Sequence, residues 1–161
     1  MKTRERMSLS HGARVTVTGE AGRFAETPLG FVPRVHLAPL ERPEADPVAV
    51  AERFLGAPYL WGGNSAFGID CSGLVQAALA ACGIACPGDT DMQESLGDAA
   101  QGAPRRGDLL FWKGHVALVR DAETLIHANA HHMAVTVEEI AAVTDRIAAA
   151  GEGPVTAHRR P

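Results

Sequence analysis

Cys71 is the residue whose type and position most directly indicate chemistry. It stands in the run Gly68-Ile69-Asp70-Cys71-Ser72-Gly73-Leu74-Val75, where polar, glycine-rich sequence gives way to apolar residues typical of a helix. Asp70 is a natural N-cap for that helix, so we expect the Cys71 sulfur at a helix N-terminus. The unpaired N–H groups and partial positive charge found there favour a thiolate and lower the pKa of a cysteine. Cys71 is therefore a candidate nucleophile.

Two histidines could supply the base that a cysteine nucleophile needs, together with the group that orients the base. His115 opens a predicted strand over residues 115–120, and His127 lies in the next strand, over residues 124–128. A lone histidine in a strand is more often a structural residue than a catalytic one. Two of them downstream of Cys71 favour a catalytic pair.

The register between these two strands decides whether the rings meet. If residues 121–123 form a three-residue hairpin loop, Arg120 pairs with Thr124, and His115 and His127 become diagonal neighbours on one face. Diagonal neighbours lie about 7–8 Å apart at the backbone, within reach of two imidazole rings. A slip of one residue would place the rings on opposite faces.

The other cysteines favour a structural interpretation. Cys82 and Cys86 could be combined with His131 and His132 into a zinc site, but a two-residue spacer and a second cysteine pair are both missing. We expect the two cysteines to be small buried side chains near a helix end, and the two histidines to lie in a solvated loop. An odd total of three cysteines fits a reducing compartment.

The elements that must position these residues begin after a linker. Pro39, Pro43 and Pro47 alternate with acidic residues, which predicts a domain boundary near residue 44. From residue 45 to 161 the pattern predicts helices over 48–55 and 71–82, strands over 108–112, 115–120, 124–128 and 133–137, a helix over 138–149 and a last strand over 155–158. Helix first and antiparallel sheet afterwards is an α+β order.

Residues 1–44 predict a small β element. The segment 14–18 alternates in polarity, residues 19–22 predict a turn, and the segment 24–32 repeats the alternation around Pro28 and Gly30. We expect short strands joined by tight turns.

Composition excludes two classes of partner. With 15 basic and 19 acidic residues the net charge is −4, which argues against binding to a nucleic acid backbone. No apolar run approaches the roughly 18 residues of a membrane span, and no export signal follows the first residues, so we expect a cytoplasmic protein that binds no membrane. A chain of 161 residues that is 46% hydrophobic can bury a core of its own.

Five segments resemble, in order, the motifs of the NlpC-like (NlpC/P60) cell-wall cysteine peptidases, a papain-like family. They are Pro58-Tyr59-Leu60-Trp61-Gly62-Gly63, Asp70-Cys71-Ser72-Gly73-Leu74-Val75-Gln76, Gly107-Asp108-Leu109-Leu110-Phe111, Gly114-His115-Val116-Ala117-Leu118 and Leu125-Ile126-His127-Ala128. The resemblance covers about residues 46–160. It implies a papain-like fold, in which the helix bearing the nucleophile packs on an antiparallel sheet.

The resemblance also implies roles for individual residues. Cys71 would be the nucleophile, His115 the general base and acid, and His127 the residue that orients His115. The Tyr59 phenol would join the Cys71 backbone N–H in holding the oxyanion, although packing in the core beside Trp61 would equally explain a tyrosine there.

Further residues would contact the substrate. Asp70 and Ser72 would line the cleft, although a plain helix cap also explains Asp70. Asp89 and Thr90 fall where family members that recycle released peptides bind a free N-terminal amine, a contact that a carboxylate makes through a charge-assisted hydrogen bond. The alternative is that Asp89 and Thr90 cap the next helix.

Members of the family cut the bond between the γ-carboxyl group of D-glutamate and a diamino acid in peptidoglycan stem peptides, without a metal or other cofactor. We therefore expect a cysteine peptidase acting on free muropeptides that begin with L-Ala. One alternative is a CHAP-like amidase that cuts at N-acetylmuramoyl-L-alanine or a cross-bridge. Another is a wall-binding protein without activity, against which the joint presence of Cys71, His115 and His127 counts.

The N-terminal strands resemble the later part of a bacterial SH3-like barrel. The segments 12–17 and 30–37 hold recognisable positions, while the opening strands of such a barrel are missing. The expected organisation is thus a partial SH3-like module and linker over residues 1–44, followed by a peptidase domain over residues 45–161.

Overall fold

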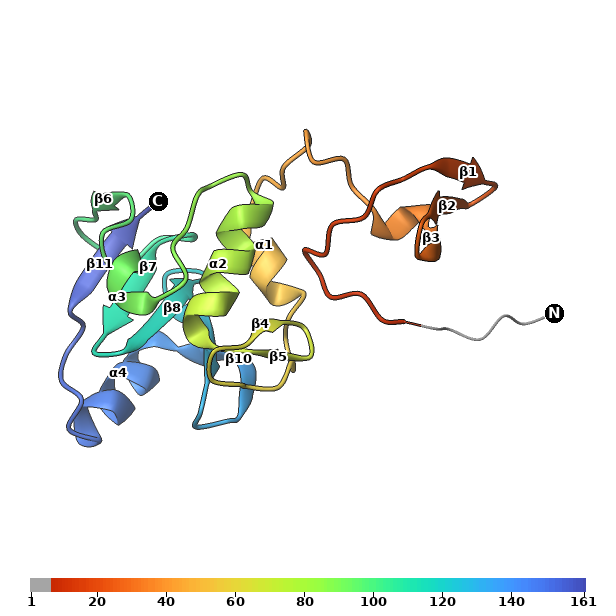
Figure 1. Cartoon of the computed structure of the whole chain (residues 1–161). Coiled ribbons are helices and arrows are strands. Elements are labelled where there is room, and N and C mark those ends of the chain that lie inside the picture. Colours follow the sequence, from red (N-terminus) through yellow and green to blue (C-terminus); the bar gives the residue numbers. More distant parts are fainter. Residues whose placement is uncertain (1–6) are drawn as a thin grey trace. The chain divides into compact units, whose positions relative to one another are not determined.

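The computed structural model describes residues 7–161, and the chain divides into two compact units between residues 43 and 44 (Figure 1). Each unit is described by itself. Within the described residues, no helix has the length and apolar character needed to cross a membrane.

The N-terminal unit contains a three-stranded antiparallel sheet in the order β1-β2-β3. Its strands are β1 (Gly19–Ala21), β2 (Phe24–Thr27) and β3 (Gly30–Pro33), and a 3-10 helix, η1 (Arg34–His36), follows. The prediction of a strand over 14–18 and a turn over 19–22 was wrong by several residues. Only Thr18 of that segment bonds to the sheet, through its N–H to the Glu26 carbonyl at 2.9 Å, and the turn lies at Gly22, whose φ is +60°.

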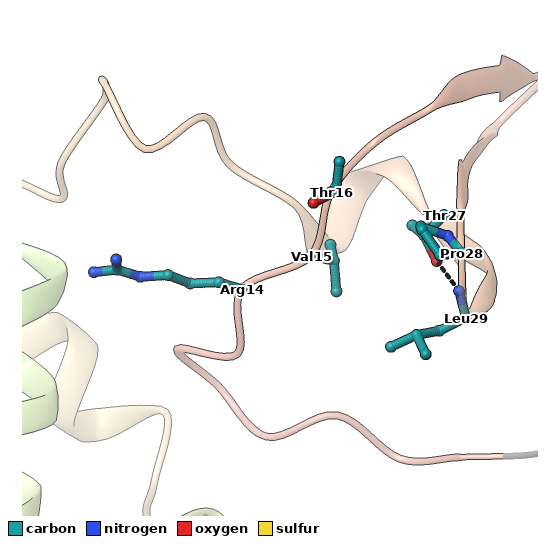
Figure 2. Close-up of a pocket in the computed structure, with 6 residues that line it drawn as sticks. All are labelled: Arg14, Val15, Thr16, Thr27, Pro28 and Leu29. Carbon is teal, nitrogen blue, oxygen red and sulfur yellow. Dashed lines mark hydrogen bonds between the residues drawn. The ribbon is translucent and has the colours of Figure 1, made fainter.

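A hollow in this unit lies between the segment before β1 and the β2–β3 turn (Figure 2). Its lining residues are Arg14, Val15, Thr16, Thr27, Pro28 and Leu29. The Thr27 hydroxyl oxygen accepts a hydrogen bond from the Leu29 N–H at 3.2 Å, drawn dashed in Figure 2, and so stabilises the turn that forms one wall. The SH3-like assignment of this unit stays a prediction.

The larger unit is built on a six-stranded antiparallel sheet in the order β10-β9-β8-β7-β11-β6. The strands are β6 (Asp98–Ala99), β7 (Leu109–Trp112), β8 (His115–Val119), β9 (Thr124–Asn129), β10 (Ala134–Glu139) and β11 (Ala157–Arg160), with a separate small hairpin of β4 (Asn64–Ser65) and β5 (Gly68–Ile69). The helices are α1 (Pro47–Glu52), α2 (Cys71–Ala81), α3 (Thr90–Gln93) and α4 (Ile140–Ala149). The predicted α+β order is confirmed.

Apolar residues cover both faces of this sheet. On one face, residues of α1 and α2 such as Val48 and Leu74 pack in one cluster with alternate sheet residues such as Leu118 and Ile126. On the other face, Val143 of α4 packs with a second cluster that includes Leu125. Alternate residues of a strand point to opposite faces, so continuous apolar runs such as 109–112 supply both cores.

One helix boundary differs from prediction in a way that matters for the site. Helix α4 was expected to begin at Glu138, but β10 continues through Glu139, which pairs with Thr124, and Glu138 pairs with Leu125. The ladder hydrogen bonds extend the strand by two residues. Glu138 therefore lies in the sheet, two residues along from Thr136, the partner of His127.

The outer edge of β10 is covered by the segment 56–59. The Gly56 N–H donates to the Val135 carbonyl at 3.0 Å, the Val135 N–H donates to the Ala57 carbonyl at 2.9 Å, and the Tyr59 N–H donates to the Met133 carbonyl at 2.9 Å. At the opposite edge, β6 is only two residues long.

Candidate active site

Asp70 organises the start of α2. Its Oδ1 accepts hydrogen bonds from the Gly73 N–H at 2.7 Å and the Ser72 hydroxyl at 3.1 Å, while Oδ2 accepts from the Gly62 N–H at 2.8 Å. The predicted N-cap is confirmed, and the same carboxylate ties the preceding glycine-rich loop to the helix. Roles of Asp70 and Ser72 towards a substrate stay predictions.

Two glycines allow this loop to lie directly on the first turn of α2. A Cβ atom placed on Gly73 would lie 2.5 Å from the carbonyl oxygen of Gly63. No side chain fits at that distance without moving the backbone. Glycine at position 73 is thus needed to keep the loop in contact with the helix that carries Cys71.

Cys71 is the first residue of α2 and is buried, with 8% of its surface exposed. Its sulfur lies 3.8 Å from the hydroxyl oxygen of Thr90. Burial raises the pKa of the Cys71 thiol, and the charge of Asp70 adds to this, while hydrogen bonds from Thr90 and from the backbone of Val116 and Ser72 act in the opposite direction. The expected lowering of the pKa is therefore not found, because desolvation outweighs the hydrogen-bond donors around the sulfur.

His115 and His127 meet as expected. The ladder between β8 and β9 pairs Leu118 with Ile126 and Val119 with Leu125, and the Arg120 N–H donates to the Thr124 carbonyl at 2.8 Å. This is the predicted register. Nε2 of His115 lies 2.8 Å from Nδ1 of His127, so the two rings share a hydrogen bond. Because Val116 follows His115 and its backbone reaches the Cys71 sulfur, the nucleophile candidate and the histidine pair lie at the same end of β8.

Burial makes both rings harder to protonate. Burial, reinforced by the neighbouring His127 and Arg146, lowers the pKa of His115 to about 3. Burial also lowers the pKa of His127, against the opposing effect of Glu138. A neutral imidazole can accept a proton, as a general base must.

Glu138 and Arg146 belong to this site but were not singled out from the sequence. Nε2 of His127 lies 2.7 Å from Oε1 of Glu138, and Arg146 of α4 forms two hydrogen bonds to the same carboxylate, at 2.6 and 2.9 Å. One feature of the sequence could have indicated Glu138: if the strand after residue 133 continued past Val137, Glu138 would share a face with His127. The contact was missed because Glu138 was assigned to a helix.

Helix α3 brings Thr90 to the nucleophile. The Gln93 side chain, fully buried, donates to the carbonyl of Ser72 at 3.0 Å and to that of Pro87 at 2.9 Å, which fastens α3 to the start of α2. Asp89 occupies the N-cap position of α3, yet its side chain makes no capping hydrogen bond among the described residues. A hollow beside α3 is lined by Thr90, Asp91, Glu94, Trp112, Lys113, Gly114 and Thr156.

Tyr59 is half-buried and packs against the core that includes Cys71. Burial raises the pKa of its phenol, and the nearby charges of Cys71 and Asp70 add to the effect. Trp61, which was the expected packing partner in the alternative interpretation, is 83% exposed. Tyr59 thus combines core packing with a place near Cys71.

The zinc site that could be drawn from Cys82, Cys86, His131 and His132 is not assembled in the structure. Cys82 and Cys86 are partly buried against the core, and across residues 7–161 no group of three or more histidine, cysteine or acidic side chains could hold a metal ion. His131 and His132 are exposed, as expected, and their rings meet edge to face at 4.7 Å. His132 also bonds to Asn129, which the expectation of a merely solvated side chain missed.

Comparison with known proteins identifies the family to which this fold and site belong. The family model described as "NlpC/P60 family" matches residues 56–150, which is more than half of the chain. The chain belongs to the NlpC/P60 family. That match spans Cys71, both histidines of the pair and Glu138.

Curated relatives resemble the chain over about half of its length. A gamma-D-glutamyl-L-lysine dipeptidyl-peptidase of Bacillus subtilis (strain 168) is 40% identical over an alignment of 87 residues, and the match covers 47% of this chain and 28% of the relative. Dipeptidyl-peptidase 6 of Lysinibacillus sphaericus is 37% identical over 84 residues, 51% of this chain and 31% of the relative. The matched segment thus spans less than a third of either relative.

Solved structures agree with the NlpC/P60 fold. The crystal structure of an NlpC/P60 family protein from Bacillus cereus ATCC 10987 superposes with a TM-score of 0.77 at 24% identity, covering 94% of this chain and 55% of that one. The NlpC/p60 domain of the peptidoglycan hydrolase SagA gives a TM-score of 0.54 at 35% identity, covering 59% of this chain and 87% of that domain. The predicted papain-like fold class is confirmed.

Proposed function

We propose that the protein is a cysteine peptidase that hydrolyses the bond between the γ-carboxyl group of D-glutamate and a diamino acid in peptidoglycan stem peptides. The observation that carries the proposal is the His115–His127 hydrogen bond at the end of β8 where the backbone of Val116, the residue after His115, bonds to the buried sulfur of Cys71. The names of two curated relatives, which refer to γ-D-glutamyl-L-lysine, support the choice of bond.

In this proposal His115 takes the proton of the Cys71 thiol as the sulfur attacks the γ-carbonyl carbon. Since the pKa of the thiol is raised and that of His115 is lowered, the resting pair is neutral, and the proton moves only when the substrate is in place. The oxyanion that forms accepts hydrogen bonds from the Cys71 N–H and the Tyr59 phenol.

Collapse of this intermediate breaks the amide bond. The departing amine of the diamino acid takes the proton from His115, and the acyl group remains on Cys71 as a thioester. Water, deprotonated by His115, then attacks the thioester. The γ-carboxylate of D-glutamate is released and the Cys71 thiol is restored.

The free N-terminal amine of the peptide is proposed to bind Asp89. The carboxylate of Asp89 is exposed and next to Thr90, whose hydroxyl group faces the sulfur. An ammonium group there gains a charge-assisted hydrogen bond. Peptides beginning with L-Ala would therefore be preferred over those still attached to glycan.

The decisive experiment uses the tripeptide L-Ala-γ-D-Glu-L-Lys and its diaminopimelate counterpart, with products identified by mass spectrometry. We expect L-Ala-γ-D-Glu and the free diamino acid, and a loss of several orders of magnitude in rate for Cys71→Ala. Cys86→Ala is the matched control and should retain activity. Full activity in Cys71→Ala would refute the proposal.

A further inference from the structure

We propose that Glu138 is a positioning residue that fixes, through His127, which nitrogen of His115 is left without a proton and faces the nucleophile. The inference rests on the proposed function only for the role it gives to His115. The influence of Glu138 on His115 passes through one intervening ring, that of His127.

Both nitrogens of the His127 ring are occupied. Nδ1 lies 2.8 Å from Nε2 of His115, and Nε2 lies 2.7 Å from Oε1 of Glu138. The ring itself is 1% exposed, so water does not compete for either nitrogen. Each of these two hydrogen bonds must therefore have one donor and one acceptor.

Glu138 enters this network as an acceptor only. Arg146 donates two hydrogen bonds to the Glu138 carboxylate, one to each oxygen, at 2.6 Å and 2.9 Å. This geometry favours the ionised form of Glu138. Although burial acts to raise it, hydrogen bonds from Arg146 and His127 lower the pKa of Glu138 to about 2. His132 is the other titratable group facing Glu138, with Nδ1 3.4 Å from Oε1.

The direction of every hydrogen bond follows from an ionised Glu138. Since the carboxylate cannot donate, Nε2 of His127 carries the proton. In a neutral ring Nδ1 is then an acceptor, so the partner nitrogen, Nε2 of His115, carries a proton as well. Nδ1 of His115 is left unprotonated and is the nitrogen available to take the proton of Cys71.

The reversed arrangement would disable the base. If His127 presented an Nδ1–H to His115, then Nε2 of His115 would accept, and its Nδ1 would hold a proton that blocks transfer from the thiol. A buried carboxylate that sets the tautomer of a catalytic histidine directly is a known device in hydrolases. Here the same effect passes through a second histidine.

The test combines imidazole nitrogen-15 NMR with kinetics, applied to the full chain. The wild-type protein should show protons on Nε2 of both His115 and His127, assigned among the seven histidines by single substitutions. In Glu138→Gln, the carboxamide no longer demands a donor, so Nδ1–H forms should appear on both rings. We expect kcat to fall about 10- to 100-fold with KM changed by less than about threefold.

Asp108→Asn is the matched control. Asp108 is also a buried carboxylate held by a histidine and an arginine, His158 and Arg160, each at 2.7 Å. The Asp108→Asn substitution should lower the stability of the fold, but it should change neither kcat nor the tautomers of His115 and His127. Arg146→Lys, which keeps a cation beside Glu138, should retain the wild-type tautomers.

Two results would overturn the inference. One is a Glu138→Gln protein that keeps both Nε2–H tautomers and a kcat within about twofold of wild type. The other, which needs no variant and so holds even if Glu138→Gln does not fold, is an Nδ1 proton on His115 in the wild-type protein. If the wild-type protein cleaves no stem peptide, the proposed function fails while the NMR result still decides the tautomers.

Discussion

The hydroxyl oxygen of Thr90 lies 3.8 Å from the sulfur of Cys71, although the two residues are 19 positions apart. The contact depends on Gln93, which fastens α3 to the carbonyl of Ser72. Two helices that begin at separate points of the chain thus converge on one sulfur atom. The hydrogen bond of Thr90 lowers the pKa of the thiol against the larger effect of burial.

Thr90→Val should make Cys71 less reactive at a given pH. Valine keeps the shape of threonine but removes the hydroxyl group, so the pKa of the thiol should rise further. A neutral hydrogen bond contributes about 0.5–1.5 kcal/mol, which corresponds to a 2- to 13-fold slower alkylation by iodoacetamide below the pKa. The rate is followed by mass spectrometry of the Cys71 peptide from pH 6 to 10. Thr144→Val, in α4, is the control, and an unchanged pH profile for Thr90→Val would contradict the prediction.

Asp89→Asn should weaken binding only of substrates with a free amine. For L-Ala-γ-D-Glu-L-Lys we expect KM to rise about 2- to 5-fold, since an exposed charge pair contributes about 0.5–1 kcal/mol. The N-acetylated tripeptide should be cleaved equally by wild type and variant. Asp98→Asn, which changes an exposed carboxylate in β6, should alter neither KM. Equal losses on both peptides would assign Asp89 a structural role instead.

Gly73→Ala should destabilise the protein and reduce its activity. The added Cβ would meet the Gly63 carbonyl at 2.5 Å, so the loop must move away from α2. We expect a loss of about 1–3 kcal/mol in the free energy of unfolding, as for other overpacked sites. Gly88→Ala is the control, because the nearest atom, Nε2 of Gln76, is 3.9 Å away. Urea unfolding compares the two variants, and equal stability would show that the loop yields easily.

Acid should destabilise the fold through His115. Its pKa is about 3 in the folded chain against an ordinary 6.5, so between these values the unfolded chain binds a proton that the folded chain does not. The free energy of unfolding therefore falls as the pH drops from about 6.5 to 3, by a few kcal/mol at most. Glu138, whose pKa is lowered to about 2, adds a loss below about pH 4.5.

His115→Asn should flatten the first part of this dependence. Unfolding by urea at pH 7, 5 and 3.5 measures the slope for both proteins. The variant should keep the loss that begins below about pH 4.5, because Glu138 remains. If the free energy of unfolding of the variant changed between pH 6.5 and 4.5 as steeply as that of wild type, a group other than His115 would cause the acid sensitivity.

The sequence was sufficient to predict those elements and site residues that depend on local patterns. Asp70 followed by an apolar helix predicts the N-cap, and the short loop between residues 120 and 124 sets the β8–β9 register that brings the two histidines together. Both features depend on residues close together in the chain.

What the sequence missed depends on contacts across the fold. The strand β10 extends to Glu139 because β9 offers it partners, and no helix propensity of residues 138–149 reveals this. The raised pKa of Cys71 likewise comes from burial in the folded core rather than from its place on the helix. Local pattern located the thiol at a helix start, while tertiary packing determined its protonation.

The segment 56–59 covers the edge of β10 by pairing with it. An uncovered strand edge presents N–H and C=O groups on which other chains can assemble, a common origin of aggregation. Here that edge is occupied, and the sheet ends on its other side in a strand of two residues. Tyr59 is the last residue of this covering segment, so the backbone that protects the sheet from self-assembly also holds the phenol near Cys71.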